Sequence, residues 1–442
     1  MALSGLDIYK LLPKTNCRAC GFATCLAFAM QLAKKAISID KCPFISEEAK
    51  RLLEASSLPP IKLVTVGEAE AKLEIGNETV LFRHEEKFHH PCGIGFIIED
   101  KSADTDIKQG IEKINKLAFE RVGQKLDVNL VAIKQTAGAK RFIEAVKLTA
   151  ANTKLALVLM SDDAEAIRQA LTLVASSRPL VYRATKEKFS EISEIAKEFK
   201  VPLVVSAADL GSLSELTTQL NNQGIADLIL DTQEKPVAEK LWDLTQIRRQ
   251  ALKKSNRSLG YPVITVIEEQ DIYEQAIQAA SYIAKYAGIV LIKGTDPSEV
   301  LSLLTLRQNI YTDPQKPLQI EPKLYPVGQV SEKSPVLVTT NFSLTYYTVL
   351  GEVEASKVPS YIISVDTEGM SVLTAWAAEK FTPEKIVDSI NKFGVREAVS
   401  DKRLIIPGYV AVMSGDLEEQ SGWQVVVGPK EAAGLPSFLK NL

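Results

Sequence analysis

The sequence predicts an α/β protein in three parts, and three observations carry this prediction. Four of the five cysteines fall within the first 42 residues. From Gly93 to Gln308, short apolar runs alternate with longer amphipathic stretches at a period of roughly 25–30 residues. After a proline-rich stretch, the same alternation resumes toward the C-terminus. We therefore expect a small helical domain, a central (β/α)8 TIM barrel and a small open α/β domain of the Rossmann-like or flavodoxin-like kind.

The first part, residues 1–57, is defined by its cysteines. Cys17, Cys20, Cys25 and Cys42 follow the pattern C-x2-C-x4-C-x16-C, with small residues between the first three. Four thiolates in a tight loop of small residues suit a cubane iron–sulfur cluster. The stretch from Cys25 to Ala36 has helical periodicity. Because cysteine fills all four ligand positions, we expect a 4Fe-4S cluster that transfers electrons.

Two other uses of these cysteines stay open. Structural zinc sites usually show two close cysteine pairs, and here only Cys17 and Cys20 form one. Disulfides need an oxidising compartment, and residues 1–30 lack the pattern of a signal peptide. The spacing C-x3-C-x2-C of radical enzymes that use S-adenosylmethionine is also absent.

Residues 58–92 are expected to be a linker that contains a β-hairpin. Gly76-Asn77 is a tight-turn signal between two runs with strand character. The expected strands are residues 62–66, 71–75 and 79–83.

The three histidines of the chain, His84, His89 and His90, lie together in this linker. Only Cys92 stands near them as a further metal ligand, so we expect a solvated connector in preference to a metal site. Cys92 itself is expected to be a buried structural thiol.

Residues 93–310 are expected to form the TIM barrel. Continuous apolar runs fit parallel strands that are buried on both faces, and a helical segment follows each run. None is followed by a Gly-x-Gly-x-x-Gly motif, which argues against a dinucleotide-binding sheet. The expected strands are residues 95–98, 128–133, 155–160, 180–182, 203–205, 228–230, 263–266 and 289–292.

Polar side chains follow these strands at positions that would line the active site of a barrel enzyme. They lack histidine and any metal-ligand spacing, and loops generally begin with polar residues, so we favour a barrel without catalysis. The positions are Asp100, Lys134, Asp162, Arg183, Ser206, Asp231, Glu268 and Lys293.

Residues 311–330 are expected to be a proline-rich linker and residues 331–442 the C-terminal α/β domain. Helices are expected from Phe342, Ser371 and Glu384 and at the end of the chain. The expected strands are residues 336–339, 360–365, 403–406 and 424–427.

The loops after these four strands would meet at one edge of the sheet, where open α/β sheets bind ligands. Gly369, Gly408 and Gly434 in these loops would allow close approach of something large and flat. Ordinary turn and capping chemistry, with Ser371 as a helix N-cap, explains the same residues equally simply.

The composition excludes several partners. The net charge is −3 with acids and bases interspersed, so bulk electrostatics does not favour nucleic acid. No apolar run is long enough for a membrane helix, and we expect a cytoplasmic protein.

The order of the three parts resembles one family. Together with the segments 6–17 (LDIYKLLPKTNC) and 368–376 (EGMSVLTAW), it is similar to the large (gamma) subunit of corrinoid/iron–sulfur proteins of the reductive acetyl-CoA (Wood–Ljungdahl) pathway. The resemblance covers the whole chain.

The resemblance implies a methyl carrier and not a stand-alone enzyme. In this family a cobalt corrinoid accepts a methyl group from methyltetrahydrofolate through a separate methyltransferase. It donates that group to acetyl-CoA synthase in anaerobic carbon fixation, and the 4Fe-4S cluster reduces stray Co(II) to Co(I). The implied partners are a small barrel subunit in a heterodimer, the methyltransferase, CO dehydrogenase/acetyl-CoA synthase and a reductive activator protein.

The resemblance also implies a corrinoid site in the C-terminal domain. Many corrinoid proteins carry Asp-x-His-x-x-Gly, whereas residues 366–369 read Asp-Thr-Glu-Gly and no histidine follows His90, so we expect base-off cobalt without a histidine ligand. Thr374 is expected near the lower face of the cobalt. The implied residues are Thr340, Asn341, Phe342, Thr345, Tyr346, Gly369, Met370, Ser371, Val372, Leu373, Thr374, Gly408, Ala432, Ala433 and Gly434.

Two competing functions remain at this stage. One is a pterin-dependent methyltransferase that acts in its own barrel. The other is an iron–sulfur electron-transfer subunit whose C-terminal domain binds only a partner protein.

Overall fold

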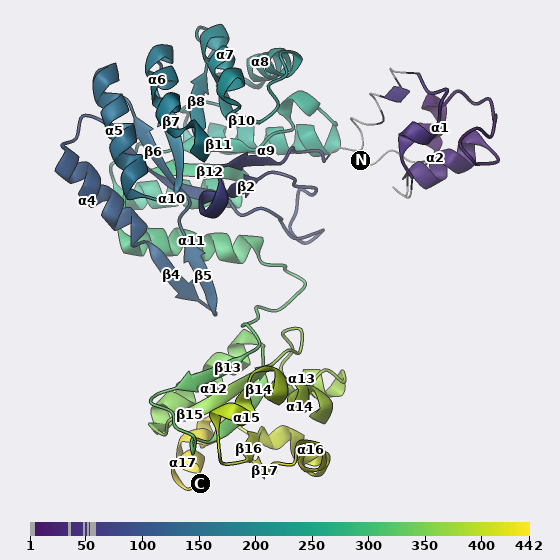
Figure 1. The fold of residues 1–442 in the computed structure, drawn as a ribbon, viewed down its shortest axis with the longest axis vertical. Helices are drawn as coiled ribbons and strands as arrows, with labels where there is room; N and C mark the ends of the chain where they lie inside the picture. Colours follow the sequence, from purple (N-terminus) through teal and green to yellow (C-terminus); the bar gives the residue numbers. More distant parts are fainter. Residues whose placement is uncertain (1–4, 34–36, 47–48, 51–52, 54–58) are drawn as a thin grey trace. The chain divides into compact units, whose positions relative to one another are not determined.

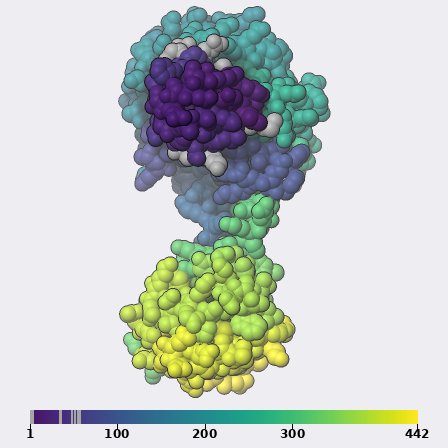
Figure 2. Space-filling model, turned by 90° about the vertical axis from the view of Figure 1, so that its right-hand side faces the viewer, coloured from purple at the N-terminus to yellow at the C-terminus, as the bar shows by residue number. Residues whose placement is uncertain are grey.

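The computed structural model describes residues 5–33, 37–46, 49–50, 53 and 59–442, and the chain separates into two compact units. The first unit comprises the residues up to Ala118 and those from Asp127 to Tyr311. The second comprises residues 119–126 and the chain from Thr312 onward, green to yellow in Figures 1 and 2. The domain boundaries expected from the sequence stay predictions.

The cysteine segment contains α1 (Gly5–Leu11), α2 (Cys25–Ala33) and the 3-10 turn η1 (Ile39–Lys41). The predicted helix after Cys25 is confirmed as α2. Residues 34–36 of that predicted helix lie outside the described residues, as do residues 1–4, 47–48, 51–52 and 54–57 of the expected cluster domain.

The central barrel is closed, and its eight parallel strands are those predicted from the apolar runs. Its helices surround the strands (Figure 1), because each helix buries one apolar stripe against them. The strands are β3 (Gly93–Glu99), β6 (Leu130–Lys134), β7 (Ala156–Met160), β8 (Leu180–Ala184), β9 (Leu203–Ser206), β10 (Leu228–Asp231), β11 (Val263–Val266) and β12 (Ala287–Ile292). The helices are α4 (Asp104–Asn115), α5 (Ala139–Asn152), α6 (Ala164–Val174), α7 (Phe189–Phe199), α8 (Leu210–Asn222), α9 (Val237–Lys253), α10 (Ile272–Ala284) and α11 (Pro297–Tyr311).

A short antiparallel hairpin, β1 (Val64–Val66) and β2 (Leu73–Ile75), closes the N-terminal end of this barrel. Its buried side chains join the core of the strand interiors, and a Cβ at Gly93 would lie 2.6 Å from Leu73 Cδ2. The prediction that Gly76-Asn77 joins two strands of a hairpin is wrong. Residues 67–72 connect the two strands that pair, and residues 79–83 form no strand. Gly76 has a positive φ of 95°, and a Cβ there would lie 2.0 Å from the Lys62 carbonyl oxygen. The position therefore requires glycine, which explains the turn-like sequence.

A second hairpin, β4 (Ala118–Arg121) and β5 (Gln124–Asp127), lies between α4 and β6 and was not predicted. Its two-residue turn, Val122-Gly123, has positive φ at both residues, the pattern of a type I′ turn. Val122 packs against apolar residues of the second unit.

The second unit contains a five-stranded sheet in the order β13-β15-β14-β16-β17. All pairs are parallel except β13 with β15, and the parallel strands follow the flavodoxin-like order 2-1-3-4. β13 was not predicted from the sequence, because it lies among prolines, which an edge strand tolerates. The strands are β13 (Leu324–Val327), β14 (Val336–Thr340), β15 (Ser360–Val365), β16 (Arg403–Ile406) and β17 (Gln424–Val427).

Helices cover both faces of this sheet. One face packs against α12 (Ser343–Ser356) and α17 (Leu435–Lys440). The other packs against α13 (Val372–Ala377), α14 (Pro383–Lys392) and α16 (Ser414–Ser421). The remaining elements are α15 (Val395–Ala398) and the 3-10 segments η2 (Ala69–Ala71), η3 (Ala175–Ser177), η4 (Arg257–Leu259), η5 (Gly408–Met413) and η6 (Ala432–Gly434). Within the described ranges, every helix is too short or too polar to cross a bilayer.

Candidate functional site

The cysteine loop is held by a reciprocal pair of bonds between Asn16 and Cys25. The Asn16 N–H donates to Cys25 Sγ at 3.4 Å, and the Cys25 N–H donates to Asn16 Oδ1 at 2.8 Å. Cys25 begins α2 and is buried, as is Cys42, while Cys20 is half-buried and Cys17 is exposed. Asn16 has a φ of 52°, a left-handed conformation that asparagine tolerates better than most residues.

The thiols lie in surroundings that suit an iron–sulfur group. Cys20, Cys25 and Cys42 all belong to one apolar cluster with α1 and α2. A hydrogen bond from the Ala19 N–H, helped by the Thr15 side chain, lowers the pKa of the exposed Cys17 thiol.

Among the described residues, no three acidic, histidine or cysteine side chains are arranged to hold a single metal ion. A cubane binds each thiolate through a different iron atom, so its ligands do not have to meet at one point. The all-cysteine donor set is of the kind that such a cluster uses.

The C-terminal unit has a cavity of about 320 Å³ at the carboxyl ends of β14, β16 and β17. It opens beside the strand pair β14 and β16, the point where the strand order reverses and where open α/β sheets bind ligands. Thr339 lines this cavity, is 1% exposed, and its hydroxyl has no hydrogen-bond partner. A buried hydroxyl left unpaired costs free energy, so the site is suited to a ligand that bonds it.

Large apolar side chains surround the opening of this cavity. Leu344, Leu373 and Tyr409 line it and are 66%, 45% and 44% exposed. Tyr409 is held by its hydroxyl, which donates to Glu431 Oε1 at 2.6 Å. The cavity is at the lower end of the usual range for small-molecule sites, about 300–1,000 Å³, so a larger flat ligand would also rest on this rim.

Asn341 organises the loop after β15. Its Oδ1 accepts the N–H groups of Thr367 and Gly369 at 2.9 and 3.0 Å and the Thr367 hydroxyl at 3.0 Å. Its Nδ2 donates to Gln319 and Asp366. Asn341 is 1% exposed and its amide is fully used, so it positions the loop and leaves no atom for a ligand.

The three glycines singled out in the sequence are explained by close contacts within the chain. A Cβ at Gly369, where φ is 76°, would lie 2.6 Å from Gln319 Cγ. At Gly408 it would lie 2.6 Å from the Gly428 carbonyl oxygen, and at Gly434 it would lie 2.9 Å from Pro429 Cβ. These glycines let the loops pack on one another, and the cavity wall follows from that packing.

The residues implied for a corrinoid divide into two groups. Those that line the cavity are Thr345, Ser371, Val372, Leu373 and Ala432. The others lie beside it: Thr340 is on the opposite face of β14 from Thr339, and Tyr346 is buried against Tyr325. Phe342 is the N-cap of α12, Met370 is half-buried against the core, and Ala433 is exposed.

Ser371 is the N-cap of α13, but its hydroxyl caps no backbone N–H. It shares a 3.0 Å hydrogen bond with the exposed hydroxyl of Thr374, one turn into the helix. Leu344 and Tyr409 were not among the ligand contacts predicted from the sequence. Their signal was a large apolar residue just after a strand-end loop, where a solvated turn would carry a polar one.

The polar residues at the barrel mouth mostly bond one another. Asp231, 1% exposed, accepts from Tyr182, Ser206, Arg183 and Lys240 and from the Gln233 N–H, at 2.9–3.4 Å. One N–H of Arg183, at Nε, has no partner. Burial lowers the pKa of Lys240, although Asp231 opposes this.

A chain of ion pairs continues around the mouth. Glu268 pairs with Lys134 at 2.5 Å and with Lys293 at 3.3 Å, and Lys293 also pairs with Glu99 at 3.2 Å. Asp100 accepts three bonds from Thr136 and Ala137 and so fixes the loop after β6. The cavity of about 340 Å³ here is thus lined largely by charges that already have partners.

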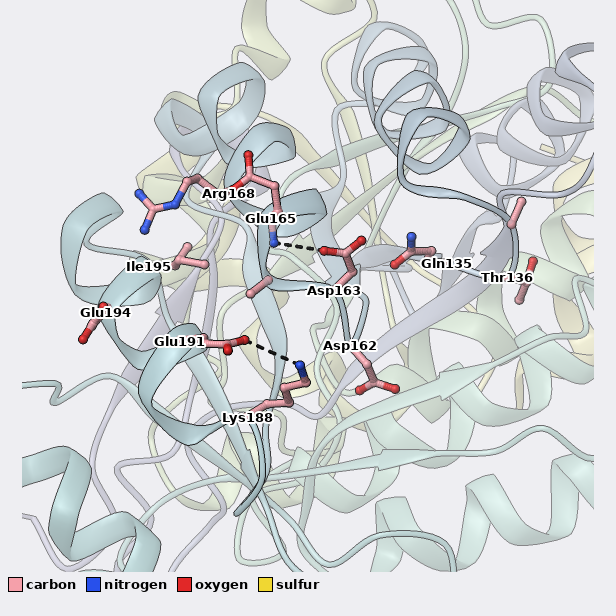
Figure 3. A pocket seen from close by; sticks show the side chains of 12 residues that line it. Gln135, Thr136, Asp162, Asp163, Glu165, Arg168, Lys188, Glu191, Glu194 and Ile195 are labelled. Carbon is pink, nitrogen blue, oxygen red and sulfur yellow. Dashed lines mark hydrogen bonds and ion pairs between the residues drawn. The ribbon is translucent and has the colours of Figure 1, made fainter.

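A groove beside this mouth is lined by the loops after β6, β7 and β8 (Figure 3). Asp163 caps α6 by accepting the Glu165 N–H at 3.0 Å, and Lys188 pairs with Glu191 at 3.6 Å. Asp162 is exposed at the junction of the groove and the cavity. Capping and pairing account for most of these charges.

Two of the three histidines, His89 and His90, bond other residues of the linker. His90 Nδ1 lies 2.7 Å from the Gly76 carbonyl, and His89 Nε2 lies 3.2 Å from Glu86. Glu78 accepts the N–H groups of both histidines. Cys92 is fully buried, and burial raises the pKa of its thiol to about 12, which makes it inert.

Comparison with known proteins gives two family matches. A model described as "CO dehydrogenase/acetyl-CoA synthase delta subunit" matches residues 63–439, and one described as "Putative Fe-S cluster" matches residues 12–44.

Full-length relatives are also found. The chain is 45% identical over 441 residues to the corrinoid/iron–sulfur protein large subunit of Moorella thermoacetica, covering 100% of this chain and 99% of the relative. It is 34% identical over 457 residues to the acetyl-CoA decarbonylase/synthase complex subunit gamma of Methanothermobacter thermautotrophicus, again covering 100% and 99%.

Among solved structures, the 7,8-dihydropteroate synthase of Vibrio fischeri matches at 14% identity, with a TM-score of 0.39. It covers 50% of this chain and 93% of that chain. A likeness this weak carries no argument about function.

Proposed function

This chain belongs to the CO dehydrogenase/acetyl-CoA synthase subunit family, among the large or gamma subunits of corrinoid/iron–sulfur proteins, and from that premise we propose that it is a methyl carrier. The bound corrinoid supplies a cobalt centre that takes up and gives up a methyl group, and the bound cluster supplies electrons that keep the cobalt reduced. The residues of this chain bind the two groups and set their surroundings.

Cys17, Cys20, Cys25 and Cys42 are proposed to bind one 4Fe-4S cluster. The support is the all-thiol donor set, the match of residues 12–44 to an iron–sulfur family, and the apolar cluster around three of the thiols. The Asn16 N–H that donates to Cys25 Sγ would help to hold this sulfur in position as a cluster ligand.

The corrinoid is proposed to bind at the C-terminal cavity. The observation that carries this proposal is the unpaired, buried Thr339 hydroxyl in a mainly apolar cavity at the switch point of the sheet. Leu344, Leu373 and Tyr409 would support the body of the macrocycle, while hydroxyls at Thr345 and Ser371 would bond its polar arms.

The lower face of the cobalt is proposed to lack an imidazole ligand. All three histidines precede residue 91, and none lies in the C-terminal unit. A weak axial donor eases reduction of the metal, in the same way that axial ligands tune haem iron. Thr374 is proposed to place its hydroxyl near this face, held by Ser371.

The carrier role requires partners. We propose a heterodimer with a small barrel subunit, and transient docking of methyltetrahydrofolate methyltransferase, CO dehydrogenase/acetyl-CoA synthase and a reductive activator. The supporting observation is that the relatives are described as a "large subunit" and as a "complex subunit gamma".

A pterin methyltransferase within the barrel is the weaker candidate. Both carboxylate oxygens of Asp231 are occupied by groups of this chain, and Glu268 is paired with two lysines. A pterin would have to displace these partners to bond the same carboxylates.

Metal analysis of anaerobically purified protein tests the proposal. Wild type is expected to carry iron, sulfide and cobalt, with about four irons per chain. Cys20→Ala is expected to lose the iron and keep the cobalt, because the two groups bind different parts of the chain. Full iron in this variant, or cobalt-free wild type prepared with its small subunit, would contradict the assignment.

A further inference from the structure

The chain around the first three cysteines contains no acidic residue. Residues 8–39 include five lysines or arginines and no aspartate or glutamate, whereas the whole chain carries 55 acidic and 52 basic residues. This stretch is therefore positive within a chain whose net charge is −3. The five are Lys10, Lys14, Arg18, Lys34 and Lys35, of which the last two fall outside the described residues.

The acidic residues on either side of this stretch already have basic partners. Asp7 contacts Lys10 at 2.9 Å, and Asp40 contacts Lys50 at 2.5 Å. Neither carboxylate is therefore left over to neutralise the other cations of the segment.

Three basic side chains stand beside cysteines and have no ion-pair partner among the described residues. Arg18 adjoins Cys17, Lys14 lies three residues before Cys17, and Lys41 adjoins Cys42; all three basic side chains are exposed. We name Lys14, Arg18 and Lys41 together the basic loop surface. Of the four cysteines only Cys17 is exposed, so the accessible edge of a cluster bound by them would lie among these cations.

Exposed apolar side chains lie close to the same cysteines in the sequence. Phe44, two residues after Cys42, is 60% exposed, and Leu26, next to Cys25, is 37% exposed. Proteins that exchange electrons meet through small interfaces, in which charges guide the encounter and specify the partner. Charge beside a small apolar area fits such a transient partner.

We propose that the basic loop surface is the docking site for a small acidic iron–sulfur protein that donates electrons, an inference that rests on the proposed cluster. An acidic partner is favoured because its carboxylates would pair with cations that have no acidic neighbour of their own. In this encounter one electron passes from the reduced cluster of the partner to the cluster of this chain. The partner is oxidised by one electron, and no bond is broken and no proton is transferred.

A different role for the same charges would be to tune the cluster itself. A cluster held by four thiolates is anionic, and its reduction potential depends on the charge around it. Removing the cations would then slow reduction by every reductant. Loss of docking would slow reduction by an acidic protein and would spare a small cationic reductant, so the two roles can be separated.

The test is the affinity of the full-length chain, prepared with its small subunit, for an oxidised bacterial ferredoxin, measured by isothermal titration calorimetry. Lys14→Glu combined with Arg18→Glu reverses two charges of the surface. Both natural residues already have a positive φ, 59° and 62°, so another non-glycine residue adds no new kind of backbone strain. We expect the affinity at low salt to fall at least about tenfold. The difference should shrink in 1 M salt, where the Debye length is only about 3 Å.

The matched control reverses two charges on the barrel. Lys140→Glu combined with Lys147→Glu changes two exposed lysines of α5, and the affinity should stay within about twofold of wild type. Iron content is measured in both double variants. If the Lys14/Arg18 variant loses its iron, Lys41→Glu reverses a charge of the same surface beside the fourth cysteine and is expected to weaken binding in the same direction.

Stopped-flow reduction of the cluster gives the second readout. Reduced ferredoxin should reduce the Lys14/Arg18 variant at least about tenfold more slowly than wild type at low salt. The methyl viologen radical, a small cation, should not be slowed.

The outcomes separate the inference from the function beneath it. If wild type binds the ferredoxin and the surface variants bind it equally well, the docking surface is overturned and the carrier proposal stands. Equal slowing by ferredoxin and by methyl viologen assigns the charges to the cluster and also overturns the surface. Wild type that binds no ferredoxin at low salt overturns the acidic partner. A wild-type chain without iron overturns the proposed cluster itself.

Discussion

The barrel mouth and the edge of the C-terminal sheet are built in the same way but differ in the residues that line their cavities. In both, loops that follow parallel strands bring polar side chains together around a cavity of similar volume, about 340 and 320 Å³. At the barrel mouth the charges pair with one another around Asp231 and Glu268. At the sheet edge the walls are mainly apolar, and the Thr339 hydroxyl is unpaired. Position in the fold gathers candidate residues at both places. The two cavities differ in their walls, which are mainly apolar at the sheet edge and lined by mutually paired charges at the barrel mouth, although Arg183 Nε has no partner there.

Replacing Asp231 with Ala should have the largest effect. It would leave Lys240 and Arg183 without their shared carboxylate, and breaking a buried ion pair costs about 3–5 kcal/mol. We expect the free energy of unfolding of the barrel, measured with urea, to fall by that amount while cobalt and iron contents per folded chain stay normal. Asp162→Ala, an exposed carboxylate on the same rim, should change it by less than about 0.5 kcal/mol. Equal effects of the two substitutions would contradict the network.

Filling the C-terminal cavity should have the opposite effect: bound cobalt should fall while the stability of the barrel is unchanged. Thr345→Trp places a large ring in the cavity from the half-buried face of α12, so bound cobalt should fall at least about tenfold. Iron content should not change, because the cluster binds elsewhere. Ala355→Trp, exposed in the last turn of the same helix, is the matched control and should retain the corrinoid. Normal cobalt in Thr345→Trp would exclude this cavity as the site.

Removing the Thr374 hydroxyl should have a smaller effect. Thr374→Val keeps the shape of the side chain and deletes its bond to Ser371, a change of about 0.5–1.5 kcal/mol. We expect a shift of roughly tens of millivolts in the Co(II)/Co(I) midpoint, measured by redox titration, with corrinoid content unchanged. A titration identical to wild type would leave Thr374 with only a helical role.

Glu268→Gln should have the smallest effect, and it should depend on pH. Burial raises the pKa of Glu268, but hydrogen bonds from Lys134 and Lys293 outweigh it and leave the pKa below its usual value. A depressed pKa stabilises the fold above the unfolded-state pKa, about 4.3, and the benefit is lost as pH falls through the folded pKa. Wild type should exceed the variant by about 0.2–1 kcal/mol at pH 7, and urea unfolding at lower pH should show that gap closing. A difference in unfolding free energy that grows as the pH falls would contradict this prediction.

The barrel could be predicted because its strands are buried on both faces and read as continuous apolar runs, as in β7. The hairpin of β4 and β5 could not, because its exposed residues give no such run, and its turn begins with Val122, a residue unusual at positive φ. Likewise β13 lies among prolines and is recognised only by its pairing with β15.

The candidate site shows the same limit. The strand-end loops could be located from the sequence, because parallel strands bring their carboxyl ends to one edge. The role of Gly369 could not, because it depends on Gln319, which lies 50 residues away and reaches the glycine only in the fold. Asn341 was predicted to be a ligand contact for the same reason, although hydrogen bonds within the chain use its whole amide.

We propose that a corrinoid occupies the C-terminal cavity without an imidazole ligand from this chain. Electron paramagnetic resonance of the Co(II) form, recorded on the full-length chain with its small subunit, tests it most directly. We expect a base-off spectrum without hyperfine splitting from an axial nitrogen, and we expect Thr345→Trp to lose this spectrum together with the corrinoid. Clear nitrogen splitting in the wild-type spectrum would contradict it.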